Sequence, residues 1–278
     1  MTRSADRLTR PEDPPLASGR TPRVAAARRL TRRSRRDSVR QFLAEGPQAV
    51  REALALDPDA PGAPSMVFGT VPALSRYADL VAGASVPVIA VDDAGMAGLS
   101  ETVSPQGLVA VCSFLDVPLS AVSGSLVAVL AEIQDPGNAG TVLRTADAAG
   151  ASGVVFTDGS VDPYNGKCVR SSAGSLFHPP VVRGVSAPSA IASLRSAGLR
   201  VLAADGYGEA DLDDLADAGE LGKPTAWVFG NEARGLPPEL AELADRRVRI
   251  PIHGRAESLN LAAAAAVCLY ASARAQRR

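Results

Sequence analysis

Residues 227–238 read WVFGNEARGLPP and join an apolar run to a polar loop. The apolar run TAWVFG ends at Gly230, and an amide, a carboxylate and a guanidinium follow within four residues, at Asn231, Glu232 and Arg234. A further glycine and two prolines then interrupt regular structure. Because α/β proteins bind ligands in loops at the ends of buried strands, we expect ligand chemistry here. The open alternative is an ordinary strand-to-helix turn.

Segments typical of strands and helices alternate on both sides of this loop. Six apolar segments predict strands, at residues 125–133, 153–157, 180–184, 199–205, 225–230 and 248–252. Helical segments separate them, at residues 139–149, 163–172 and 188–197, from Pro237, and at residues 259–274. This alternation predicts an α/β fold with a doubly wound parallel sheet.

The chain is expected to have four parts. Residues 1–22 are polar, proline-rich and basic, and we expect a disordered tail. Residues 23–115 are expected to form a small α/β domain, residues 116–124 a linker, and residues 125–278 the larger domain. Within the small domain a helical region is predicted over residues 23–56, in which Val39, Phe42 and Leu43 share one face.

Composition indicates a soluble globular protein, with 46% hydrophobic and 21% charged residues. No apolar run is long enough to cross a membrane, and the arginine-rich start lacks the apolar core of a secretory signal. Cys112, Cys168 and Cys268 are isolated and fit no zinc or redox motif. We therefore expect a cytoplasmic protein with free thiols and no metal.

Positive charge is concentrated at the start of the chain. Residues 1–40 contain twelve arginines and four acidic residues, a net charge of +8, so the remainder carries −9 of the total of −1. Such a cluster is typical of a surface that binds a polyanion, although a solvated helix or a flexible tail has the same composition. The candidate RNA-binding residues are Arg28, Arg29, Arg32, Arg33, Arg35 and Arg36.

Two further segments place polar residues at strand ends. In residues 132–150 a strand leads through a loop into a helix that carries Arg144 near its start. The helix dipole disfavours a cation there, so we infer an anionic partner; pairing with Asp147 or Asp135 is the alternative. In residues 249–261 a strand leads to Ser258, which is the expected N-cap of an alanine-rich helix.

Two other chemistries have weaker support. The GYG at residues 206–208 follows a strand, but it lacks the third glycine of a dinucleotide-binding fingerprint. A hydrolase triad could combine Ser258 with His253 or His178 and with Asp135, but the chain has no GxSxG elbow.

Together, three segments resemble the motifs of the SpoU (TrmH) family of RNA ribose 2′-O-methyltransferases, in the SPOUT superfamily. They are NAGTVLRTADAAG at residues 138–150, VFGNEARGL at 228–236 and IPIHGRAESLNLAAAAA at 250–266, with RSSAGSLFHPPVV at 170–182 between the first two. RRDSVRQFLAEGPQAVREAL (residues 35–54) and LSETVSPQGLVAVC (residues 99–112) resemble the L30-like substrate-binding domain that often precedes this catalytic domain.

The resemblance implies a trefoil-knotted catalytic domain, a homodimer and bound S-adenosylmethionine. It implies that the reaction site contains Asn138, Arg144, Glu232, Ser258 and Asn260, with Arg144 acting at the cofactor of the other subunit. It also implies that Leu202, Ala203, Gly230, Ile250 and Leu259 line the cofactor pocket.

The implied reaction is transfer of a methyl group to a ribose 2′-hydroxyl, without a metal. Because a guanidinium is a poor base, we expect Arg144 to orient the hydroxyl and stabilise the developing alkoxide. Ribosomal RNA of the large subunit is the expected substrate, in view of the L30-like domain. A tRNA methyltransferase, a non-catalytic RNA-binding protein and, last, a nicotinamide-dependent dehydrogenase are the alternatives.

Overall fold

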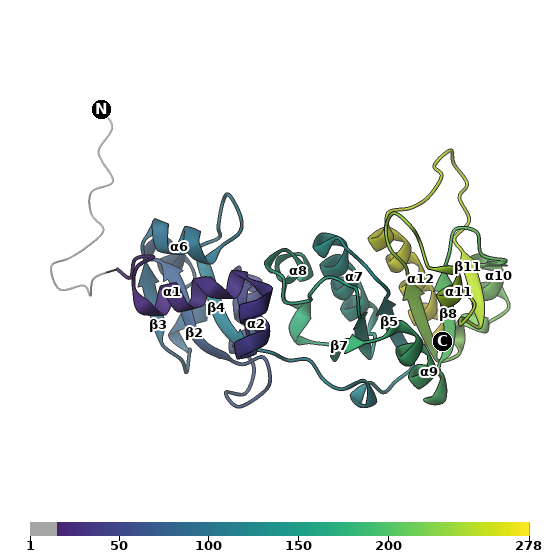
Figure 1. Ribbon diagram of the computed structural model, residues 1–278, viewed down its shortest axis with the longest axis horizontal. Helices are drawn as coiled ribbons and strands as arrows, with labels where there is room; N and C mark the ends of the chain where they lie inside the picture. The colour runs from purple at the N-terminus through teal and green to yellow at the C-terminus, as the bar shows by residue number, and fades with distance from the viewer. Residues whose placement is uncertain (1–15, 278) are drawn as a thin grey trace. The chain divides into compact units, whose positions relative to one another are not determined.

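The computed structural model describes residues 16–277 and divides the chain into two compact units between Phe114 and Leu115 (Figure 1). The expected tail is therefore described only from residue 16, and residues 1–15 lie outside the described part. Residues 16–22 belong to unit 1 rather than to a tail, because Ala17 donates a backbone hydrogen bond to Ala90 and accepts one from Asp92.

Unit 1 is a four-stranded sheet with helices packed against it. The strand order is β1-β4-β2-β3, in which β2 and β3 are parallel and the other pairs are antiparallel. Its strands are β1 (Gln41–Glu45), β2 (Pro64–Thr70), β3 (Val88–Val91) and β4 (Leu108–Ser113). Its helices are α1 (Pro22–Arg28), η1 (Arg29–Thr31), α2 (Arg33–Val39), α3 (Pro47–Leu54), α4 (Val71–Arg76), α5 (Ala78–Ala82) and α6 (Asp93–Leu99).

The prediction of a helix through residues 39–43 is wrong. Helix α2 ends at Val39 because Arg40 adopts a left-handed conformation with φ of 52°. Residues from Gln41 onward pair instead with β4, where Phe42 lies opposite Cys112. A cluster of apolar residues that can line one helix face can also form a short buried strand, and the partner strand decides between the two.

Unit 2 is a seven-stranded parallel sheet, which confirms the predicted fold class. The strand order is β7-β6-β5-β10-β8-β11-β9, from β5 (Leu126–Leu130), β6 (Gly153–Thr157), β7 (Val181–Val185), β8 (Arg200–Ala204), β9 (Ala210–Asp211), β10 (Thr225–Phe229) and β11 (Arg246–Arg249). The two-residue strand β9 adds to the six expected strands. The helices are η2 (Leu119–Ala121), α7 (Pro136–Ala149), α8 (Gly166–Ser172), η3 (Ser175–Phe177), α9 (Ala187–Ser196), α10 (Leu212–Asp217), η4 (Glu220–Gly222), α11 (Pro238–Ala241) and α12 (Leu261–Gln276).

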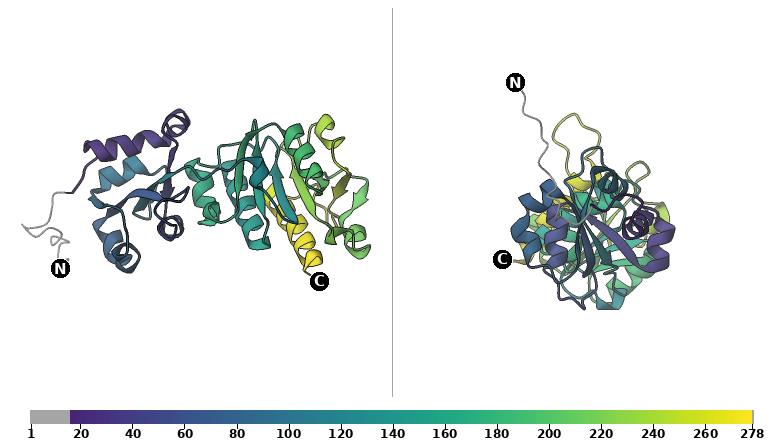
Figure 2. Two further views of the ribbon diagram at one scale, coloured as in Figure 1. Left: turned by 90° about the horizontal axis from the view of Figure 1, so that it is seen from below. Right: turned by 90° about the vertical axis from the view of Figure 1, so that its left-hand side faces the viewer.

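Helices lie on both faces of this sheet (Figure 2). Val127 and Val129 of β5 pack in one core with apolar residues of α9 and α11. Trp227 in the central strand β10 is fully buried, and its indole N–H donates to the Ser272 hydroxyl of α12 at 2.9 Å. Because β5 and β10 are covered on both faces, every residue of both strands is buried.

The segment expected as a linker is part of unit 2. The backbone N–H groups of Leu115 and Asp116 donate to the Tyr164 hydroxyl, and the N–H of Val117 donates to Val181. Val122 belongs to the hydrophobic core of the unit. Residues 116–124 are therefore fixed to the larger unit. Within residues 16–277, no helix combines the length and the apolar character that a membrane span needs.

Candidate active site

The loop after β10 is closed by hydrogen bonds of its own. Asn231 and Gly235 exchange two backbone hydrogen bonds, at 2.9 and 2.8 Å. The buried Asn231 side chain accepts from the backbone of Ala233 and Arg234 and donates to the Glu132 carbonyl. Asn231 therefore holds the turn and ties it to the end of β5.

Gly230 is required by the same turn. A β-carbon at Gly230 would lie 2.5 Å from backbone atoms of Gly235 and Leu236. The resemblance implies that this glycine lines the cofactor pocket. The structure shows a closer reason, which is that the loop folds back over the end of its own strand.

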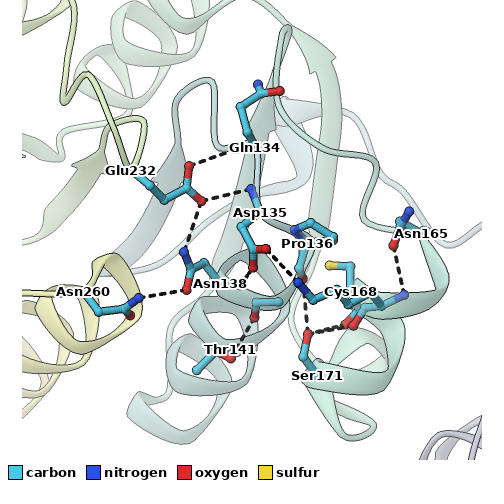
Figure 3. Close-up of polar contacts among 12 residues, drawn as sticks. Gln134, Asp135, Pro136, Asn138, Thr141, Asn165, Cys168, Ser171, Glu232 and Asn260 are labelled. Atoms are coloured by element: carbon cyan, nitrogen blue, oxygen red, sulfur yellow. Dashed lines mark hydrogen bonds and ion pairs between the residues drawn. The ribbon is translucent and has the colours of Figure 1, made fainter. Parts of the chain in front are cut away.

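Glu232 connects this loop to the start of α7 (Figure 3). Its carboxylate accepts from the backbone N–H groups of Gln134 and Asp135, each at 3.1 Å, and from the Asn138 amide at 3.3 Å. The turn after β5 presents these N–H groups because Glu132 adopts a left-handed conformation with φ of 55°. This departure from ordinary backbone geometry has no signature in the sequence.

Asn138 extends the chain of contacts to the third segment. Its side-chain carbonyl accepts from the Asn260 amide at 3.2 Å. Asn260 is also the N-cap of α12, where its oxygen accepts from Ala262 and Ala263. The expectation that Ser258 caps this helix is therefore wrong: the helix begins later, and Ser258 lies in the exposed loop before it. Three of the predicted site residues thus form one continuous chain, Glu232–Asn138–Asn260.

The first turn of α7 is held by a pair of residues that the sequence reading missed. Asp135 caps the helix by accepting from the N–H of Asn138 at 2.8 Å, and its other oxygen binds the Lys167 ammonium at 2.7 Å. Lys167 comes from α8, which lies against α7. A β-carbon at Gly140 would lie 2.3 Å from the Cys168 carbonyl, so the glycine of the first motif is needed for this close packing.

Arg144 is exposed on α7, while Val142 and Leu143 beside it are buried. Both carboxylates considered as its partners are engaged elsewhere, since Asp135 binds Lys167 and Asp147 binds His178 at 2.8 Å. Within residues 16–277, Arg144 makes no hydrogen bond or ion pair. The guanidinium is therefore available to an anionic ligand from outside this chain.

A cavity of about 180 Å³ lies beside Glu232 at the carboxyl ends of β8, β10 and β11. Gly230, Ile250 and Leu259, which the resemblance assigns to the cofactor pocket, line this cavity, and so does Ser258. The other lining residues are Ala204, Asp205, Gly206, Phe229, Asn231, Glu232, Gly235, Val248, Ile252, Glu257, Leu261 and Ala264. The lining combines apolar side chains with loop backbone and three carboxylates, and this suits a cationic organic ligand.

The prediction that Leu202 and Ala203 line the cofactor pocket is wrong. Both are fully buried inside β8, opposite Trp227 and Val228. The strand continues to Ala204, and the residues that reach the cavity are Ala204, Asp205 and Gly206. The strand was predicted over residues 199–205, and its final residues, rather than Leu202 and Ala203, reach the cavity.

The carboxylates of Glu232 and Asp135 stay ionised at neutral pH. Burial raises the pKa of Glu232, but the hydrogen bonds from backbone N–H groups and from Asn138 outweigh burial and lower it below its ordinary value. The Lys167 ammonium lowers the pKa of Asp135, and the N–H of Asn138 adds to this. Glu232 is therefore a hydrogen-bond acceptor and not a proton donor near neutral pH.

The predicted RNA-binding arginines divide into two groups. Arg28, Arg29, Arg32, Arg33 and Arg35 are exposed on unit 1. Arg36 is only 4% exposed, and its guanidinium donates to the carbonyls of Leu30 and Thr31 at 3.0 and 2.9 Å. Arg36 therefore stabilises the end of η1, and its inclusion among RNA-binding residues is corrected.

Other candidate chemistries find little support. Burial raises the pKa of Cys112, Cys168 and Cys268, so these thiols are unreactive. Among residues 16–277, no group of three His, Cys, Asp or Glu side chains is arranged to hold a metal ion. Arg234 pairs with Glu132 at 3.2 Å and supports the loop.

Comparison with known proteins gives matches over both units. Residues 125–270 match the SpoU rRNA Methylase family, and residues 21–110 match the MRM3-like substrate binding domain. The 23S rRNA (guanosine(2553)-2′-O)-methyltransferase RlmP of Bacillus subtilis is 36% identical, over 92% of this chain and 97% of that protein.

Solved structures agree over nearly the whole chain. An AdoMet-bound rRNA methyltransferase from Sinorhizobium meliloti superposes with a TM-score of 0.78 at 33% identity, over 93% of this chain and 97% of that one. The SpoU methyltransferase AviRb from Streptomyces viridochromogenes, in complex with AdoMet, gives a TM-score of 0.78 at 31% identity, over 93% and 98% of the two chains.

Proposed function

Because the chain belongs to the SpoU rRNA methylase family, it is an S-adenosylmethionine-dependent ribosomal RNA 2′-O-methyltransferase, and we propose that its target ribose lies in 23S rRNA. The observation that carries the proposal is the Glu232–Asn138–Asn260 chain beside the cavity. It joins three segments that are far apart in sequence at one edge of the sheet. The 23S assignment also has the support of RlmP, which is similar over both units.

The cavity suits the cofactor that the family uses. Backbone at Gly230 and apolar side chains of Ile250 and Leu259 offer a surface for an adenosine, and Asp205, Glu232 and Glu257 provide negative charge near a sulfonium. S-adenosylmethionine supplies the methyl group. The residues of the chain then bind it, orient the ribose and exclude water.

The roles of the site residues follow from their contacts. Glu232 and Asn260 fix the Asn138 side chain from two sides, so Asn138 presents one orientation to the ribose. Arg144 has no partner within residues 16–277, and we assign it to the 2′-hydroxyl and the adjoining phosphate. As a permanent cation it stabilises the developing alkoxide, and Ser258 in the exposed loop contacts the nucleotide.

The assembly belongs to the same proposal. We propose a cytoplasmic homodimer in which Arg144 acts at the other subunit's cofactor. The exposed face of α12 supports an interface. Val267 and Tyr270, two large hydrophobic residues of this mainly apolar helix, are 42% and 52% exposed, and a second subunit would cover them. The trefoil knot is part of the proposal and is supported by α12, which follows a long loop and returns to pack against α7 and β5.

The test is methyl transfer from radiolabelled S-adenosylmethionine to a 23S rRNA transcript, followed by mapping of the methylated ribose. We expect one site of modification with wild-type protein and a loss of about a hundredfold or more in turnover with Arg144→Ala. Two controls accompany the assay: light scattering measures whether the variant is still a dimer, and calorimetry measures whether it still binds the cofactor. Unchanged turnover in a folded, cofactor-binding variant would contradict the role of Arg144.

A further inference from the structure

Lys167 of α8 lies at the start of α7, next to a residue of the methyl-transfer site. Its ammonium is 2.7 Å from the Asp135 carboxylate, and the two side chains are 54% and 43% exposed. An exposed ion pair contributes little to stability, so folding alone is a weak reason for this contact. The contacts around the pair give a stronger reason, because they lead directly to Asn138.

Asn138 is held between two carboxylates. Its backbone N–H donates to Asp135 at 2.8 Å, and its side-chain amide donates to Glu232 at 3.3 Å. The same Glu232 oxygen also accepts the backbone N–H of Asp135 at 3.1 Å, so the two anions lie around one residue (Figure 3). Neighbouring like charges repel each other, and the Lys167 ammonium offsets this repulsion from the Asp135 side. Both carboxylates can therefore bind Asn138 at the same time.

Close packing of α8 on α7 fixes the direction from which Lys167 approaches. A β-carbon at Gly137 would lie 2.9 Å from Cε of Lys167, so the lysine stem passes directly over this glycine. One turn further along α7, a β-carbon at Gly140 would lie 2.0 Å from Oγ of Ser171. The Ser171 hydroxyl also donates to the Pro136 carbonyl at 3.2 Å. The first turn of α7 is thus fastened to α8 at three points, and the ion pair is one of them.

We propose that Lys167 is a positioning residue for methyl transfer, which acts through Asp135 to hold Asn138 in the orientation that the ribose requires. The proposal rests on the RNA methyltransferase function and adds a residue to that site. Lys167 is not among the residues that line the cavity beside Glu232, so it acts at a distance from the cofactor. Without its charge, the Asp135 cap on Asn138 loosens, and the amide presents more than one orientation to the ribose.

The alternative role for a half-exposed ammonium is direct contact with an RNA phosphate. The two roles differ in the kinetic constant that they control. A phosphate contact that is equally strong in the ground state and the transition state changes KM for RNA, whereas a misplaced reaction residue lowers kcat. Steady-state kinetics with varied RNA therefore separates a positioning residue from an RNA contact.

The test changes the charge of Lys167 and keeps the length of its side chain. Lys167→Met removes the charge, and Lys167→Arg restores it. Lys223→Met is the matched control, because Lys223 is the other lysine of the chain, is 59% exposed and pairs with Glu220 at 3.0 Å. Lys223 precedes β10 and so lies at the opposite end of that strand from the site. Methyl transfer by the full chain to a 23S rRNA transcript gives kcat and KM, and calorimetry gives cofactor affinity.

We expect Lys167→Met to lower kcat about tenfold, with KM for RNA and cofactor affinity within about twofold of wild type. Lys167→Arg should recover most of the loss, and Lys223→Met should match wild type. A wild-type kcat in Lys167→Met would overturn the inference. A rise in KM alone would also overturn it and would make Lys167 an RNA contact.

A second measurement does not depend on turnover. The chain contains four asparagines, so labelling with ¹⁵N-asparagine gives few side-chain amide signals in an NMR spectrum. We expect the Asn138 signal to shift or broaden in Lys167→Met and to stay in place in Lys223→Met. An unaltered Asn138 signal in Lys167→Met contradicts the positioning role. If this signal changes as expected and the wild-type protein fails to methylate the transcript, the proposed function alone is refuted.

Discussion

The polar residues at the sheet edge of unit 2 and the arginines of unit 1 differ in how fully they are engaged. Glu232, Asn138 and Asn260 bind one another, and the carboxylate has three donors. The arginines at residues 28–35 are exposed, and among them Arg33 pairs with Asp37 at 3.7 Å. Side chains bound to one another define a fixed geometry, which chemistry needs, whereas exposed cations attract a polyanion over a broad surface. Arg144 is the exception, an unpaired cation on the helix that also carries Asn138.

The largest effect is expected from Asn138, at the centre of the Glu232–Asn138–Asn260 chain. Asn138→Ala removes the link between Glu232 and Asn260, and we expect turnover to fall about a hundredfold because Asn138 no longer fixes the ribose. Single-turnover methyl transfer measures this. Thr141→Ala, one turn along the same helix, is the control and should retain most activity. Equal turnover for Asn138→Ala and wild type would show that the network is only structural.

A smaller effect is expected from the exposed arginines. Replacing Arg28, Arg29, Arg32, Arg33 and Arg35 by alanine should weaken RNA binding and flatten its salt dependence, since each phosphate contact to single-stranded RNA contributes about 0.7 to the slope of log affinity against log salt. Filter binding at several salt concentrations measures the slope. An unaltered slope in the five-residue variant would exclude these arginines from the RNA contact surface.

Arg36 separates a buried arginine from its exposed neighbours. Arg36→Ala leaves the carbonyls of Leu30 and Thr31 without their donor, so we expect the free energy of unfolding of unit 1 to fall by about 1–3 kcal/mol. Arg35→Ala should leave stability within about 0.5 kcal/mol. Urea unfolding of both variants gives the comparison. A matched stability of the two would contradict the structural role given to Arg36.

The smallest effect concerns acid stability. The pKa values of Glu232 and Asp135 are below their ordinary values in the folded protein, so their stabilisation is complete above the unfolded-state pKa values and is lost as the pH falls below about 4. Lys167→Ala removes the main cause of the lowered pKa of Asp135, so the loss of stability with falling pH should be smaller and should be complete at a higher pH. The exposed pair itself contributes less than about 1 kcal/mol at neutral pH. Urea unfolding across this pH range tests the shift.

Much of the fold could be predicted from local patterns. The runs at residues 153–157 and 225–229 are strands because apolar runs of this length suit a sheet buried on both faces. Helix α7 ends at Ala149 because Gly150 takes a left-handed conformation. The pattern misled at residues 39–43, where pairing with β4 overrides a helical arrangement of apolar residues.

For the candidate site, the residues could be predicted from the sequence, but the hydrogen bonds between them could not. The residues of the Glu232–Asn138–Asn260 chain were identified through the resemblance, but the bonds between them depend on contacts across 94 and 122 residues. Lys167 was missed because a lone lysine carries no motif. Arg36 and Arg144 look alike in sequence, and only burial separates them.

The sequence by itself determined the alternating strands and helices, the family and the residue types at the strand ends, because these follow from periodicity and short motifs. The tertiary structure alone decided that Asn260 rather than Ser258 caps α12, that Gly230 makes room for its own loop, and that Arg36 is buried. Each of these depends on which distant backbone or side chain lies within hydrogen-bonding or van der Waals distance, and local sequence does not encode that distance.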